Sequence, residues 1–200
     1  MGRPQSLDVD DLLDHARAIW VAERVAAVTI RALSARSGVS NGAIYHHFAS
    51  RNHLLAQVWA REASGFLAFQ AEEVRRAREA GTATDAVVAA ALATGAYSVA
   101  NADATRVLMA SRPGSSAGDG VPETLQAQLR QYRASAATLL ADLAHDLWSR
   151  RDATAVTVVR ACAVDIPARL FVTARSPNDP LARFVVERAV RGVLAEEPPR

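Results

Sequence analysis

The stretch that decides the fold runs Thr29-Ile-Arg-Ala-Leu-Ser-Ala-Arg-Ser-Gly38, then Val39-Ser-Asn-Gly-Ala-Ile-Tyr-His-His-Phe48 and Ala49-Ser-Arg-Asn-His-Leu-Leu55. Thr29 is a good N-cap residue and Ile30 and Leu33 follow at helical spacing, so a short helix is predicted. Gly38 ends it, because glycine adopts the left-handed conformation without steric cost. Ser40 then caps a second helix. Two short helices joined by such a tight turn are typical of a helix-turn-helix.

The second helix of this pair has an inward and an outward face. The inward positions of the whole motif are Ile30, Leu33, Val39, Ile44 and Phe48. The outward positions of the second helix are Asn41, Gly42, Tyr45 and His46. Small residues at its start allow another surface to approach the backbone closely. The same corner occurs in unrelated helical proteins, so the motif alone does not decide the function.

Charge is distributed unevenly along the chain. The net charge is only +2, all 23 residues of the Lys+Arg count are Arg, and 21 residues are acidic. Between Arg24 and Arg61, however, there are five Arg, three His and no Asp or Glu. A surface that faces phosphates requires this pattern, because a carboxylate at the contact would repel the DNA backbone.

The rest of the chain also reads as helices, so the predicted fold class is all-α. An N-terminal helix carries Val9, Leu12, Leu13, Ala16, Ile19 and Trp20 on one face. Further helices are predicted at about 50–80, 85–100, 103–111, 122–147, 153–173 with a bend near Pro167, and 179–195. The segment 112–121 reads as a loop, and the tail 196–200 as frayed.

Several other classes of protein are disfavoured. No uninterrupted apolar run of about 18 residues is present, so no membrane span is expected. The single cysteine, Cys162, cannot form an internal disulfide, which fits a reducing compartment. The protein is therefore expected to be soluble and cytoplasmic.

No catalytic or metal site is predicted. His46 and His47 are adjacent on a helix and point about 100° apart, so they cannot both bind one metal ion. Asp142, His145 and Asp146 form a solvated helix face more readily than a metal site. The sequence contains no glycine-rich phosphate loop and no nucleophile motif, so we expect neither an enzyme nor a bound cofactor.

The sequence resembles the DNA-binding domain of the tetracycline-repressor (TetR) family. The residues that carry the resemblance are Gly38-Val39-Ser40, Gly42-Ala43-Ile44-Tyr45-His46-His47-Phe48, Ser50-Arg51 and Leu54-Leu55, with Ala16, Ile19, Trp20 and Thr29 upstream. It covers roughly residues 6–66. One position departs from the family pattern: Arg24 stands where the family usually has the glycine that closes the first helix, so this helix is expected to end differently around residues 25–27.

The resemblance implies how residues 6–66 contact double-stranded DNA, with the helix-turn-helix at about 29–48. Backbone amides near Thr29 and the Arg31 side chain would meet phosphates. Asn41 would read adenine and Ala43 a thymine methyl group. The other candidate DNA contacts are Ser40, Gly42, Tyr45, His46, His47 and Arg51, the last as a phosphate clamp. For His47 a packing or capping role remains the alternative.

The resemblance implies a different role for residues 67–200. They would bind a small-molecule effector of hydrophobic character and form a homodimer through the last two helices, 153–173 and 179–195. The dimer would bind a palindromic operator, most simply as a repressor, with an activator or a ligand-independent DNA-binding protein as alternatives. Candidate pocket residues, each with a place in the core or on the surface as its alternative, are Tyr97, Arg106, Met109, Tyr132, Trp148, Asp165 and Phe171.

Overall fold

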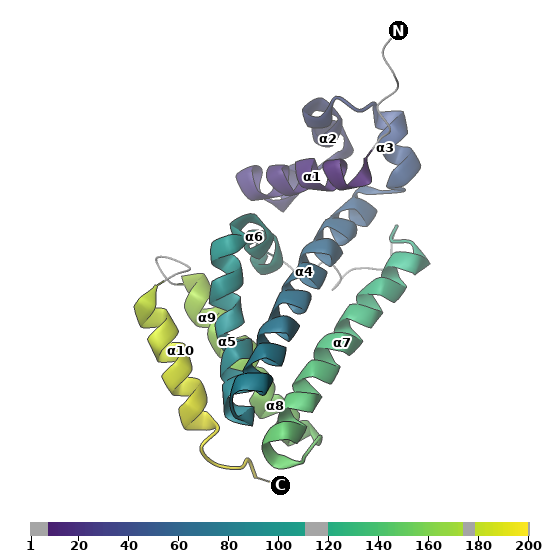
Figure 1. Cartoon of the computed structure of the whole chain (residues 1–200). Helices are drawn as coiled ribbons and strands as arrows, with labels where there is room; N and C mark the ends of the chain where they lie inside the picture. The colour runs from purple at the N-terminus through teal and green to yellow at the C-terminus, as the bar shows by residue number, and fades with distance from the viewer. Residues whose placement is uncertain (1–7, 111–119, 174–178, 200) are drawn as a thin grey trace. The chain divides into compact units, whose positions relative to one another are not determined.

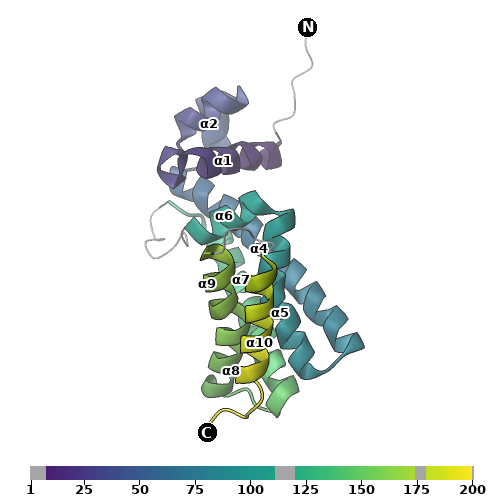
Figure 2. The same cartoon turned by 90° about the vertical axis from the view of Figure 1, so that its left-hand side faces the viewer.

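A computed structural model describes residues 8–110, 120–173 and 179–199 (Figures 1 and 2). These ranges form helices and no strand, so the predicted all-α class is confirmed. The α-helices are α1 (Val9–Glu23), α2 (Ile30–Ser37), α3 (Asn41–His47), α4 (Arg51–Ala80), α5 (Ala83–Ala100), α6 (Ala102–Ala110), α7 (Glu123–Trp148), α8 (Ala153–Arg160), α9 (Ile166–Thr173) and α10 (Pro180–Val193). Most of the predicted loop 112–121 lies outside the described residues.

The helices form two compact units. The first comprises Met1–Ala63 and Asp103–Leu129, and the second comprises Ser64–Ala102 and Arg130–Arg200. Neither unit is contiguous in sequence. In the first unit, Val121 and Leu125 form a buried cluster with Ala56 of α4, so residues that follow the described part of α6 contribute to the packing of this unit.

Local caps set the ends of the helices in the first unit. The Thr29 hydroxyl accepts a hydrogen bond from the Ala32 amide at 3.0 Å, and the Ser40 hydroxyl accepts one from the Ala43 amide at 3.3 Å. Gly38 ends α2 with φ of 74°, in the left-handed region. The predicted caps and turn of the helix-turn-helix are therefore confirmed, and they place Ile44 and Phe48 at zero exposure in the core.

The connection between α1 and α2 has a backbone conformation that is rare for a side-chain-bearing residue. Helix α1 ends at Glu23, and Val25–Ala27 form a 3-10 turn labelled η1. Arg24, between them, has φ of 72° and ψ of 166°. Residues with a β-carbon rarely occupy this region, which is essentially limited to glycine. The expected irregular end of the first helix is thus located at Arg24.

Helix α5 forms the centre of the second unit, where it packs against α9 and α10 (Figure 1). It is the one described helix that is long and apolar enough to cross a membrane by length and composition, with a mean hydropathy of 1.3. Polar residues interrupt it, which is why no uninterrupted apolar run is visible in the sequence. In the structure 56% of this helix is buried, as in the core helix of a globular unit.

A capping box and an ion pair fix the start of α5. The Thr82 hydroxyl accepts a hydrogen bond from the Asp85 amide, and the Asp85 carboxylate accepts one from the Thr82 amide. Arg191 of α10 pairs with the same carboxylate at 2.8 Å. The hydrogen bonds from Thr82, together with Arg191, lower the pKa of Asp85 to about 2. Asp85 therefore stays ionised and joins the start of α5 to α10 over the whole physiological pH range.

The predicted helix at 153–173 is interrupted by a π-helical turn, Ala161–Asp165, between α8 and α9. Pro167 follows directly, and it lacks the amide hydrogen that would bond to Ala163. Its ring would also clash with that carbonyl in a regular helix, so widening the preceding turn relieves the contact. The sequence predicts a bend near Pro167, and the structure has a π-helical turn at Ala161–Asp165, directly before Ile166 and that proline.

The expectation of a frayed C-terminal tail is wrong for residues 196–199. The Arg150 guanidinium pairs with Glu197 at 3.1 Å and donates to the carbonyls of Pro198 and Pro199 at 2.7 Å and 3.2 Å. Asp152 holds the other side of that guanidinium at 2.7 Å. A planar group with several donors can hold an extended segment in this way, which no local helical signal predicts.

Candidate nucleic-acid interface

Helix α3 separates its core residues from a free outer face. Ile44 has no exposed surface, whereas the side chain of Tyr45 is 55% exposed. Asn41, Gly42 and His46 are also exposed, and Ala43 is partly exposed. The four positions predicted to face outward therefore do so. Three of them offer an amide, a phenol and an imidazole, and the fourth, Gly42, leaves its backbone uncovered by a side chain.

Among the residues that the structure describes, none packs against the α-carbon of Gly42 on the side where a side chain would stand. A β-carbon built at this position meets no atom within 4 Å, and the residue does not have a positive φ. Glycine inside a helix is unfavourable by about 1 kcal/mol relative to alanine. Neither the backbone conformation nor the packing of the described residues requires glycine here, and a residue without a side chain lets another surface approach the backbone closely.

The exposed start of α2 offers further cationic and amide groups. Arg31, in the first turn, is exposed, as are Arg24 and Arg36. Thr29 is exposed too and satisfies the Ala32 amide through its hydroxyl. The remaining amides at the start of α2 lie at the positive end of the helix dipole, where anions bind favourably.

The stretch from Arg24 to Arg61, which contains no Asp or Glu, is called here the acid-free window. Two of its five arginines form hydrogen bonds or ion pairs within the protein. Arg61 pairs with Asp14 at 2.7 Å and with Glu62 at 2.9 Å. Arg51 donates from Nε to the Val28 carbonyl at 2.6 Å and from Nη2 to the Val25 carbonyl at 2.5 Å. The positive charge that is fully displayed in this window therefore comes from Arg24, Arg31 and Arg36.

The histidines of the window differ in their surroundings. His46 is exposed and His47 partly buried, and their ring centroids lie 5.4 Å apart with the rings nearly perpendicular. Burial lowers the pKa of His53, whose Nδ1 accepts a hydrogen bond from the Ala49 amide at 3.2 Å. His53 is therefore neutral near pH 7 and contributes to the start of α4, not to the surface charge.

The candidate pocket residues are scattered over both compact units. Arg106 and Met109 lie on α6 in the first unit, and Arg106 pairs with Asp103 at 3.5 Å. In the second unit, the Tyr97 ring packs against Phe66 and Phe69 with centroids 5.4 Å and 5.5 Å away. The others are Tyr132 and Trp148 on α7, Asp165 in the π-helical turn and Phe171 on α9. Of the seven, Phe171 lines a described cavity.

That cavity, of about 260 Å³, has mostly apolar walls. It is lined by Leu92, Gly95, Ala96, Val99, Phe171, Asp179 and Arg183. The ring of Phe171 packs so closely over Gly95 that a β-carbon there would lie 2.6 Å from a ring carbon. The cavity can hold a small apolar group, with Asp179 and Arg183 as its charged residues.

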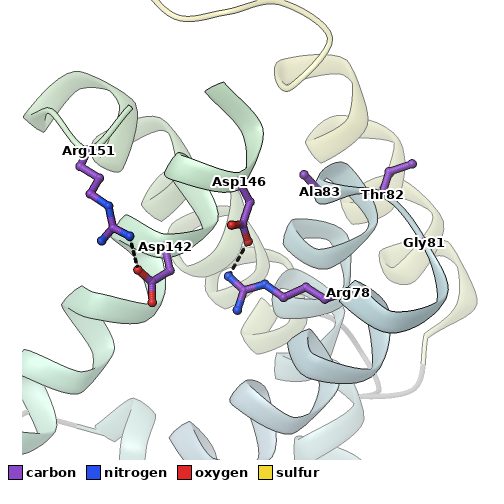
Figure 3. A pocket seen from close by; sticks show the side chains of 7 residues that line it. All are labelled: Arg78, Gly81, Thr82, Ala83, Asp142, Asp146 and Arg151. Carbon is purple, nitrogen blue, oxygen red and sulfur yellow. Dashed lines mark ion pairs between the residues drawn. The ribbon is translucent and has the colours of Figure 1, made fainter. Parts of the chain in front are cut away.

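A larger and more open cavity, of about 500 Å³, is lined mostly by polar residues (Figure 3). Arg78 and Asp146 point toward one another across it and pair at 2.6 Å, and Arg151 pairs with Asp142 at 2.8 Å. The charges therefore neutralise one another in pairs. Among the described residues, no group of three or more His, Cys, Asp or Glu is arranged to hold a metal ion.

A known family model matches the part of the sequence that contains the helix-turn-helix. Residues 12–58 match the family model described as bacterial regulatory proteins, tetR family. No curated protein matches the sequence. Among solved structures, the fold is similar to PfmR, a TetR family transcriptional regulator from Thermus thermophilus, with a TM-score of 0.65, 16% identity and 92% and 97% of the two chains covered.

Two further solved structures show the same fold. A bacterial regulatory protein in the tetR family from Rhodococcus RHA1 is 16% identical, with a TM-score of 0.68 over 96% of this chain and 97% of that one. FadR of Bacillus subtilis, a transcriptional regulator solved in complex with stearoyl-CoA, is 12% identical, with a TM-score of 0.65 over 94% and 97%. The likeness thus extends well beyond the residues of the family model.

Proposed function

We propose that this chain, whose residues 12–58 match the tetR family of bacterial regulatory proteins, is a repressor: a homodimer that binds a palindromic operator in double-stranded DNA and releases it when a small molecule binds. In this proposal residues 6–66 bind DNA, and residues 67–200 bind the effector and form the dimer. A regulator of this kind acts on DNA in the cytoplasm.

One observation carries the DNA-binding part of the proposal. The outward face of α3 combines an exposed amide at Asn41 with a glycine at Gly42 that neither the backbone conformation nor the packing of the described residues requires. It lies within a sequence window that has no carboxylate from Arg24 to Arg61. Amide side chains pair bidentately with adenine in the major groove, and the absence of carboxylates allows phosphates to approach.

Replacing Asn41 with alanine should reduce sequence preference more than general DNA affinity. A good bidentate base contact contributes about 1–3 kcal/mol of discrimination, so affinity for the operator should fall by roughly 5- to 150-fold. Affinity for a scrambled duplex should change little. The measurement is fluorescence anisotropy on both duplexes, using an operator selected by the wild-type protein from a random-sequence library. Equal losses on both duplexes would contradict a base-reading role for Asn41.

Replacing Gly42 with alanine should raise the stability of the protein and weaken its binding to the operator. Alanine has the higher helix propensity and its methyl group enters open space, so the folded state should gain up to about 1 kcal/mol. The same methyl group should weaken operator binding, because it would stand between α3 and the DNA. Chemical denaturation and anisotropy report the two quantities. The control is the reverse substitution away from the helix-turn-helix, Ala71→Gly at an exposed position of α4, which should lower stability and leave operator affinity unchanged. Unchanged operator affinity for Gly42→Ala would show that DNA does not approach this backbone.

The effector part of the proposal is supported by the apolar cavity against Phe171 and by the FadR structure, which contains stearoyl-CoA. We therefore propose an effector with a hydrophobic portion. Helix α4 runs without interruption from Arg51, beside the helix-turn-helix, to Ala80 in the second unit, so a ligand that displaces it alters the spacing of the recognition helices.

Effector binding should lower operator affinity about 5- to 150-fold, and DNA should lower effector affinity by the same factor, because coupling is reciprocal. Hydrophobic metabolites, with stearoyl-CoA among them, would be screened by thermal shift. Any that bind would then be titrated into the protein–operator complex. A compound that binds tightly yet leaves operator affinity unchanged is not the effector. If every binder behaves in this way, control by a ligand is ruled out.

A further inference from the structure

The Arg51 guanidinium bridges both ends of the η1 turn. Its Nε donates to the Val28 carbonyl at 2.6 Å and its Nη2 to the Val25 carbonyl at 2.5 Å. The side chain belongs to the first turn of α4 and reaches back 23 and 26 residues in sequence. Its planar fork offers donors on two different nitrogens in a fixed geometry, which the single nitrogen of a lysine ammonium group does not.

The segment that Arg51 holds leads directly into α2. Val28 is fully buried and precedes Thr29, the N-cap of α2. The turn itself has two backbone hydrogen bonds of its own, from the Ala27 amide to the Arg24 carbonyl at 3.1 Å and from the Val28 amide to the Val25 carbonyl at 3.3 Å. It also begins at Arg24, whose φ of 72° is unfavourable for a residue with a β-carbon. The direction in which the chain enters α2 therefore depends strongly on the two hydrogen bonds from Arg51.

We propose that Arg51 is a positioning residue for DNA binding: by holding the Val25 and Val28 carbonyls it fixes the phosphate-facing start of α2, and it does not itself contact a phosphate. This inference rests on the proposed DNA-binding function. It replaces the sequence-based expectation of a phosphate clamp. Two of the five N–H donors of the guanidinium are occupied by these carbonyls, so moving the group toward a phosphate would break both hydrogen bonds, one of them to the buried Val28.

The salt dependence of binding separates the two roles. A residue that contacts a phosphate releases counterions, so its loss reduces the slope of log affinity against log salt by about one. A positioning residue lowers affinity without that change in slope. Arg31, exposed in the first turn of α2, is the matched reference for a phosphate contact.

The experiment measures operator affinity at several salt concentrations for wild type, Arg51→Lys, Arg51→Ala and Arg31→Ala, at a temperature where circular dichroism shows all four folded. Both Arg51 variants should lose at least tenfold in affinity and keep the wild-type slope, whereas Arg31→Ala should lower the slope by about one. Near-wild-type affinity for Arg51→Lys, together with a reduced slope for Arg51→Ala, would overturn the proposal in favour of a phosphate contact.

Two further readouts distinguish positioning from a general loss of stability. Hydrogen exchange in the absence of DNA should speed up in Arg51→Lys at the amides from Val28 to Leu33, and not in α3. The effect of Arg31→Ala should also be smaller in the Arg51→Lys background, because α2 is already misplaced there. The positioning role would be rejected if the losses of operator affinity in Arg31→Ala and Arg51→Lys were additive and if hydrogen exchange in Arg51→Lys changed equally in α2 and α3. If the wild type selects no DNA sequence, the proposed function fails, while the exchange experiment still decides what Arg51 does to α2.

Discussion

Replacing Leu181 with arginine is expected to convert the protein from a dimer to a monomer and to remove tight operator binding. Helix α10 buries Ala182, Val186 and Val190 against the rest of its unit. It nevertheless leaves large apolar residues in solvent, with Leu181 66%, Phe184 57%, Val193 46% and Val185 38% exposed. A helix that needs only one apolar face to pack has no use for these residues in a monomer, and such patches mark interaction surfaces.

A second copy of the same helix is the occupant that fits this surface best. In a two-fold dimer the same residues of both protomers meet, so an apolar strip is complementary to itself. Gly192, whose β-carbon position is open, permits close approach of a partner helix near the end of the strip. This supports the proposal that the last two helices form the dimer, with α10 as the larger proposed contributor.

The expected loss of affinity is large because each half-site alone binds weakly. Specific complexes of dimeric regulators have dissociation constants of about 10⁻⁸–10⁻¹¹ M, whereas non-specific binding lies near 10⁻⁴–10⁻⁶ M, so a drop of roughly 10³-fold or more is expected. Sedimentation velocity would follow the oligomeric state and anisotropy the DNA affinity. Ala71→Arg, at an exposed position of α4, adds the same charge away from α10 and should leave both unchanged. A wild-type protein that is monomeric at micromolar concentration would contradict the dimer.

The parts of the fold that depend on local interactions could be predicted from the sequence. The caps at Thr29 and Ser40 and the left-handed Gly38 act over three or four residues, so their positions could be predicted directly. Periodicity likewise identified the buried faces of α1 and α3, with Leu12 and Ile44 among the least exposed residues. The outward face of α3 then followed from the inward one by helical geometry.

Contacts between distant segments could not be predicted in the same way. Arg51 and Arg150 donate to main-chain carbonyls, which every residue carries, so no side-chain pattern identifies their partners. The packing of Val121 and Leu125 against α4 depends on where the chain returns after α6, which the sequence leaves open. The exposed strip of α10 was equally ambiguous, because a buried core helix has the same apolar residues.

Replacing Arg24 with glycine is expected to stabilise the N-terminal unit by about 1–2 kcal/mol. Arg24 has φ of 72° and ψ of 166°, a region in which a residue with a β-carbon costs about 1–3 kcal/mol. Glycine adopts it freely, but its greater freedom in the unfolded chain offsets about 0.4–1 kcal/mol of the gain. The TetR family usually has glycine at this position, as the conformation requires. Urea denaturation followed by tryptophan fluorescence measures the change, with Trp20 and Trp59 buried in the same unit.

The control for this prediction is Arg24→Ala, which removes the charge but keeps the β-carbon. If backbone conformation is the cause, alanine should leave stability within about 0.5 kcal/mol of the wild type, as for an ordinary surface substitution. If repulsion between Arg24 and the other cations of the acid-free window were the cause, alanine would stabilise as much as glycine. A second control, Gly38→Ala, should change the stability in the opposite direction. The backbone at position 38 has φ of 74°, which favours the glycine already present there. Alanine there should therefore destabilise the same unit, by about 1 kcal/mol or more.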